Sequence, residues 1–128
     1  MKQKVPESGV LNACLGLLAA ERIWHERRNN VPVMVPAGNG RMRPIKVAQN
    51  GTADIMATPF LNCIESELRY EHEIVPLWIE CKSDSGKQSQ AQKDFEKQVK
   101  AAGHQYIVVR SSDELKRWLI DHGAMREK

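Results

Sequence analysis

The chain has too few cysteines for a disulfide framework, and no two of them have the spacing of a metal site. Its 128 residues contain three cysteines, Cys14, Cys63 and Cys81, with no C-x-x-C pair. The longest apolar run, Val10 to Ala20, is too short to span a bilayer and lacks the basic start and cleavage site of a secretory signal. We therefore expect a cytoplasmic protein of a bacterial or phage-infected cell, with no membrane partner.

Internal repeats and low-complexity segments are also missing, which excludes solenoids and disordered tracts. A chain of 128 residues with 41% hydrophobic content predicts one globular domain over residues 1–128. The net charge of +3 allows a nucleic-acid partner without requiring one.

The distribution of positive charge is more informative than the total. Six cations fall within 25 positions, where only Glu26 offsets them: Arg22, Arg27, Arg28, Arg41, Arg43 and Lys46. A solvated basic face and a nucleic-acid contact both explain this cluster.

Hydrophobic spacing and turn residues predict a mixed α/β domain in the order α-β-β-β-β-α-β-α. Ser89 and Gln92 are spaced as a capping box, and the strand after that helix should lie parallel to the strand before it. Residues 58–73 predict a short helix or an irregular insertion. The expected helices are 7–26, 90–102 and 112–122, and the expected strands are 31–35, 41–47, 52–57, 74–81 and 106–109.

The triplet Glu80-Cys81-Lys82 ends the apolar run of the fourth expected strand. Strand side chains alternate between faces, so Glu80 and Lys82 should share a face while Cys81 points into the core. Asp54 lies 26 positions earlier on the strand expected to be adjacent. Two carboxylates and an ammonium suit a hard divalent cation and a phosphodiester. A surface Glu–Lys pair at a strand end is the alternative explanation for the triplet alone.

Further motifs surround the triplet in a fixed order. Gly51-Thr52-Ala53-Asp54-Ile55 precedes it, Gln92 stands three residues before Phe95 after it, and Val108-Val109-Arg110 ends the next strand. With Glu7 on the first helix, this set resembles the VRR-NUC domain of the PD-(D/E)XK nuclease superfamily, from Pro6 to about Leu119. The resemblance implies a restriction-endonuclease-like mixed β-sheet flanked by helices.

The resemblance also implies roles for the matching positions. Asp54 and Glu80 would bind Mg²⁺, for which Mn²⁺ substitutes, and Lys82 would be the catalytic lysine. Glu7 would reach the metal through water, and Gln92 would sit beside the lysine. The backbone carbonyl of Cys81 is a further candidate ligand. Gln92 is also the capping-box residue, and the two roles are compatible.

The function that follows is a metal-dependent DNA endonuclease selective for branched DNA such as Holliday junctions. Relatives made of this domain alone imply a homodimer, for which the first helix and residues 60–68 are candidate interface elements. Asn39, Arg41 and Arg43, in a hairpin expected beside the site, and Lys87 are candidate DNA contacts. Solvated turn residues are an equal alternative for the hairpin positions. The chain departs from the family pattern in the long segment between Asp54 and Glu80.

Three other functions stay open at this point. One is a DNA-binding module without catalysis, and another is a nuclease of broad duplex and single-strand specificity. The third is a metal-free α/β interaction domain in which the triplet is incidental.

Overall fold

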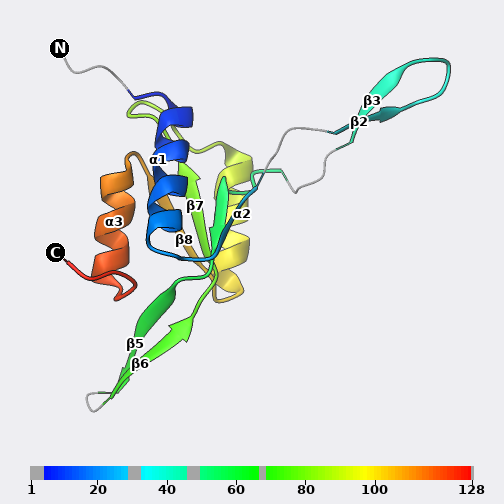
Figure 1. Cartoon of the computed structure of the whole chain (residues 1–128). Coiled ribbons are helices and arrows are strands. Elements are labelled where there is room, and N and C mark those ends of the chain that lie inside the picture. The colour runs from blue at the N-terminus through cyan, green and yellow to red at the C-terminus, as the bar shows by residue number, and fades with distance from the viewer. Residues whose placement is uncertain (1–4, 29–32, 46–49, 67–68, 128) are drawn as a thin grey trace.

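The structure is a computed structural model that describes residues 5–28, 33–45, 50–66 and 69–127 (Figure 1). Its centre is a four-stranded sheet in the order β1-β4-β7-β8, with the parallel pair β7/β8 and two antiparallel pairs. The mixed α/β class and the parallel last strand are therefore confirmed. The strands of this sheet are β1 (His25–Arg27), β4 (Ile55–Ala57), β7 (Leu77–Cys81) and β8 (Gln105–Val109).

Helices cover both faces of this sheet (Figure 1). The helices are α1 (Glu7–Ala20), α2 (Gln90–Ala101) and α3 (Ser112–Asp121). The larger core lies under α1 and α3, where Leu18, Ile79 and Leu115 are fully buried. A smaller core under α2 contains Phe95 and Tyr106. None of the helices in the described ranges has the length and apolar character needed to cross a bilayer.

Two β-hairpins extend from opposite ends of the sheet (Figure 1). One, the β2–β3 arm, pairs Val33–Pro36 with Met42–Ile45. The other, the β5–β6 arm, pairs Phe60–Ser66 with Arg69–Ile74. The short helix or irregular structure expected within 58–73 is thus wrong, because Phe60 pairs with Ile74 in a ladder that local spacing does not reveal, while an insertion at this place stays a prediction. Three strands, β1, β5 and β6, were not expected, and the element order becomes α-β-β-β-β-β-β-β-α-β-α.

The first helix ends earlier than its apolar spacing predicts. It was expected to run to about Glu26, but it ends at Ala20, and Arg22 adopts a left-handed conformation with φ of 57°. The N–H of Ile23 then donates to the carbonyl of Leu18 at 3.0 Å, which closes the last turn. This reversal frees residues 25–27 to pair with β4 as an edge strand.

The start of α2 is fixed by the capping box that the sequence predicts. Ser89 Oγ accepts the N–H of Gln92 at 3.1 Å, and Gln92 Oε1 accepts the N–H of Ser89 at 2.8 Å. Ser111 and Glu114, at the start of α3, have the spacing of a second capping box, but only half of it is formed. Ser111 accepts the N–H of Glu114, but the Glu114 carboxylate turns to the N–H of Arg110 instead.

The turn before Asp54 packs directly against this helix start. Gly51 has a φ of +79°, and a Cβ built there would lie 2.2 Å from the carbonyl oxygen of Ala91. Only glycine allows both that backbone conformation and that close approach. The turn that leads into Asp54 and the first turn of α2 therefore hold each other in place.

We predict that Gly51→Ala destabilises the protein much more than Gly103→Ala. Both glycines have positive φ, but a Cβ at Gly103 meets nothing within 4 Å, so that variant carries backbone strain alone, about 1–2 kcal/mol. Gly51→Ala adds the clash with Ala91 and should lower the free energy of unfolding by about 2–5 kcal/mol in urea titrations. Equal losses in the two variants would show that the contact does not constrain the turn.

Candidate functional site

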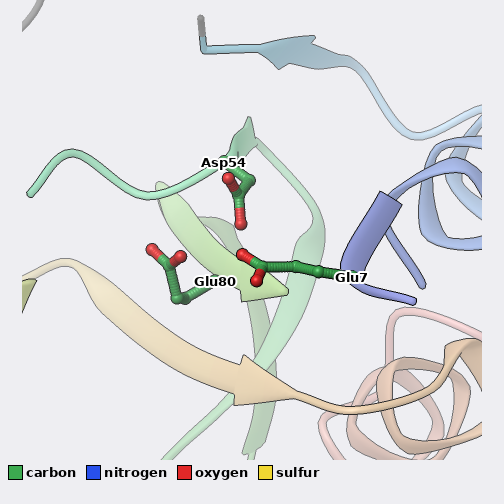
Figure 2. Close-up of side chains that lie close together, drawn as sticks. All are labelled: Glu7, Asp54 and Glu80. Carbon is green, nitrogen blue, oxygen red and sulfur yellow. The ribbon is translucent and has the colours of Figure 1, made fainter. Parts of the chain in front are cut away.

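Three carboxylates from three different elements meet at one edge of the central sheet. Glu7 is the first residue of α1, Asp54 lies in the bend just before β4, and Glu80 is near the end of β7. One carboxylate oxygen from each lies within 4.8 Å of the others, and Figure 2 shows the three side chains gathered together. The strand pattern predicted that Asp54 and Glu80 meet, and the family resemblance implied that Glu7 joins them. Asp54, however, stands ahead of the strand rather than inside it.

Asp54 is held by hydrogen bonds to two neighbouring strands. Its Oδ2 accepts the backbone N–H of Cys81 at 2.8 Å, which ties it to the end of β7. Its own carbonyl accepts the N–H of Arg28 at 2.7 Å, which ties it to the residue after β1. These bonds position the Asp54 carboxylate beside Glu80 before any ligand arrives.

Glu80 is the buried member of the group, with 1% of its surface exposed. Its Oε1 accepts a hydrogen bond of 3.0 Å from Gln92 Nε2, while its Oε2 has no partner among the described residues. Burial, followed by the nearby charge of Asp54, raises the pKa of Glu80 from 4.5 to about 9. Without a cation, the Glu80 carboxyl is therefore mostly protonated near neutral pH, because the protein alone does not compensate the charge of its ionised form.

Lys82 lies on the same face as Glu80, as strand alternation predicts. It is 7% exposed, and its Nζ stands 3.9 Å from Glu80 Oε1. Its backbone N–H donates to the carbonyl of Val109 at 2.9 Å, which extends the β7–β8 pairing by one residue. That bond keeps a buried ammonium next to the acidic group although Lys82 lies beyond the end of β7.

Gln92 serves the helix cap and the acidic site at the same time. Its side-chain oxygen accepts the N–H of Ser89, and its side-chain nitrogen donates to Glu80. The capping contact and the contact with the acidic group are compatible because they use opposite ends of one amide. The helix start is thereby linked to the orientation of the Glu80 carboxylate.

Cys81 has its side chain in the larger core, as expected, where it is fully buried and its free thiol forms a hydrogen bond with the free thiol of Cys14. That hydrogen bond, followed by burial, raises the pKa of the Cys81 thiol. The thiol therefore stays neutral and faces away from the carboxylates. The role of the Cys81 carbonyl as a ligand stays a prediction.

The candidate DNA-binding residues lie outside this group. Asn39, Arg41 and Arg43 are exposed on the β2–β3 arm, which extends away from the sheet instead of lying against the site as expected (Figure 1). The reason is that β2 and β3 form a sheet of their own and do not join the central one. Lys87 is exposed in the loop that leads to α2.

Arg110 is a residue whose role sequence reasoning missed. Its guanidinium donates to the carbonyls of Ser83 and Gly86, the latter at 2.7 Å, in the loop that follows Lys82. The cation thus fixes the path of the chain from the site to α2. The arginine at the end of an apolar strand was visible in the sequence, but nothing local identified its partners.

The chemistry of this group fits a divalent cation. Three carboxylates within 4.8 Å of one another repel, and the fully buried one has an oxygen without a partner among the described residues. Oxygen ligands from Asp and Glu are those that Mg²⁺ and Mn²⁺ bind.

Comparison of the chain with family models, with curated proteins and with solved structures gave no match.

We predict that Glu80→Gln changes how stability depends on pH when EDTA removes divalent ions. The folded state holds the Glu80 proton more tightly than the unfolded state, so wild-type stability should fall as the pH rises from 4.5 towards 9. The variant cannot ionise at this position. The free energy of unfolding of the variant, minus that of wild type, should therefore be about 1–3 kcal/mol larger at pH 8.5 than at pH 5.5.

Urea unfolding at the two pH values measures this gain. Asp84→Asn, a change to an exposed carboxyl of the neighbouring loop, is the matched control and should track wild type. If the free energies of unfolding of wild type and Glu80→Gln differ by the same amount at both pH values, then ionisation of Glu80 does not destabilise the metal-free protein, and the prediction is contradicted.

Proposed function

We propose that this protein is a metal-dependent nuclease that hydrolyses phosphodiester bonds in DNA. The observation that carries the proposal is the buried Glu80 carboxylate, whose Oε2 lacks a partner among the described residues beside two further carboxylates. A buried ammonium, Lys82, stands 3.9 Å from the same carboxylate. A site that combines a cation's ligands with a fixed positive charge suits a phosphodiester, which is negatively charged and gains charge on its oxygens during hydrolysis.

The roles of the residues follow from their positions. Asp54 and Glu80 would hold Mg²⁺ or Mn²⁺, with Glu7 reaching the ion from the exposed start of α1. When bound, the ion supplies Lewis acidity to the phosphate and to water. Lys82 would orient the attacking water or stabilise charge on the phosphoryl oxygens, because its ammonium faces the same side as Glu80. Gln92 would hold the Glu80 carboxylate in orientation through its amide hydrogen bond.

The proposed fold is that of the restriction-endonuclease-like nucleases, and the VRR-NUC domain is the branch that the motifs resemble. The arrangement that supports it is local to the site. Asp54 immediately precedes β4 and the Glu80-Cys81-Lys82 triplet ends the adjacent antiparallel strand β7, with the capped helix α2 following the triplet. The glutamine of that helix donates a hydrogen bond to Glu80, the acid of the triplet, and its place beside the lysine stays a prediction.

The proposed substrate is branched DNA. A single α/β domain of 128 residues offers little surface for reading base sequence, so DNA shape is the feature that we propose it recognises. The homodimer that the resemblance implies stays a prediction. Phe60 and Ile74 support the choice of the β5–β6 arm as one interface element, because they form a register pair and are 53% and 63% exposed.

We predict that the purified protein cuts DNA in Mg²⁺ or Mn²⁺ and that Asp54→Ala and Lys82→Ala each lower the rate at least about a hundredfold. The assay uses four-way junctions, flaps, duplex and single strands, and the four-way junction should be cut fastest. Asp84→Ala and Lys97→Ala, at exposed positions outside the acidic group, are the matched controls and should cut as wild type does.

Two results would contradict the proposal. Full activity in both site variants would separate cleavage from this group of residues. Binding of DNA without cleavage of any substrate in either metal would favour a binding module instead.

A further inference from the structure

The β2–β3 arm belongs to a stretch of chain with only positive charge. Between Glu26 and Asp54 the sequence has no acid and five cations: Arg27, Arg28, Arg41, Arg43 and Lys46. Arg41 and Arg43 lie at the tip and on the returning strand of the arm, and both are exposed. A positively charged projection of this kind is complementary to a phosphate backbone and repels other cationic surfaces.

The two faces of the arm differ in chemistry. Cross-strand register places Met34 opposite Pro44 and Pro36 opposite Met42, which makes one face apolar throughout its described side chains. The other face carries Arg43 opposite Val35. Met34 and Met42 are 52% and 55% exposed. An isolated two-stranded ribbon is only marginally stable in water, so a surface that covers this apolar face would also stabilise the arm.

The root of the arm is fixed at the acidic site. The N–H of Arg28 donates to the carbonyl of Asp54 at 2.7 Å, so the chain leaves for the arm and returns from it beside a candidate metal ligand. The Arg28 guanidinium also lies over the Trp78 ring, 5.9 Å from its centroid. The Trp78 indole N–H is itself held by His104 Nδ1 at 2.9 Å. Arg28 and Asp54, which lie on either side of the stretch that carries the arm, are therefore next to the three carboxylates.

We propose that the β2–β3 arm lies along a groove of duplex DNA and bends the duplex at the cleavage site. Arg41 and Arg43 contact phosphates, and the apolar face made by Met34, Pro36, Met42 and Pro44 meets the bases. A two-stranded ribbon fits a DNA groove, and methionine and proline are side chains that wedge between base steps and kink the helix. This inference rests on the proposed nuclease function, because it names how that site would hold its DNA.

The experiment measures affinity and bending in the full chain carrying Lys82→Ala, which prevents cutting. The probe is a 30-base-pair duplex with a fluorescent donor and acceptor at its ends. Arg41→Ala with Arg43→Ala should weaken binding roughly 10- to 100-fold and reduce the slope of log affinity against log salt by about 2. Met34→Ser with Met42→Ser should abolish the rise in energy transfer that reports bending, with a smaller loss of affinity.

The matched control is Lys97→Ala with Lys116→Ala, which removes two exposed cations from α2 and α3 and should leave both readouts unchanged. Arm variants that bind and bend the duplex as the control does would overturn the inference. So would a methionine variant that turns a dimer into a monomer in sedimentation while the salt slope is kept, because the arm would then be a protein interface.

These outcomes separate the arm from the nuclease proposal. One outcome is that binding and bending depend on the arm but the protein with Lys82 intact cuts no DNA. This outcome supports the proposed role of the arm and contradicts the nuclease proposal. Cleavage by a protein whose arm variants bind and bend normally supports the nuclease and contradicts the arm. A protein that binds no DNA contradicts both.

Discussion

The buried carboxylate of Glu80 is the constraint on which the architecture of the site depends. It lies between the sheet and α2, 1% exposed, with one oxygen bonded to Gln92 and the other without a partner among the described residues. Ionising a carboxyl in this buried place is costly, which raises its pKa to about 9, so its ionised form needs a compensating positive charge. The Lys82 ammonium, whose Nζ lies 3.9 Å from Glu80 Oε1, compensates part of the negative charge, but Asp54 and Glu7 add more at the same place. A divalent cation would resolve the imbalance, and this is why we interpret the group as a metal centre.

The surrounding structure holds these groups through backbone contacts more than through side-chain ion pairs. Asp54 is fixed by the N–H of Cys81, and the turn before it fits against α2 only because Gly51 has no side chain. The capping box sets the start of α2 and with it the Gln92 amide that meets Glu80. Arg110 fixes the loop between Lys82 and α2. The polar site is therefore preorganised by the same elements that fold the domain.

The parts of this arrangement that depend on local periodicity could be predicted from the sequence. Strand alternation put Glu80 and Lys82 on one face and Cys81 in the core, and the Ser89–Gln92 spacing located the start of α2. Pairings between distant segments could not be predicted in this way. The ladder that joins Phe60 to Ile74 and the edge strand after α1 depend on tertiary contacts, and the left-handed turn at Arg22 interrupts a pattern that still looks helical. The carbonyl partners of Arg110 are likewise set by the fold alone.

The most direct test of the proposed metal centre is calorimetric titration of Mn²⁺ into the metal-free protein near pH 8, with no DNA present. We predict saturable binding to the wild type and at least tenfold weaker binding to Asp54→Asn, because that change removes a charged ligand beside Glu80. Asp84→Asn alters an exposed acid of the nearby loop and should bind as wild type does. Equal binding by all three proteins, or no binding even when DNA is added, would contradict a metal site formed by Glu7, Asp54 and Glu80.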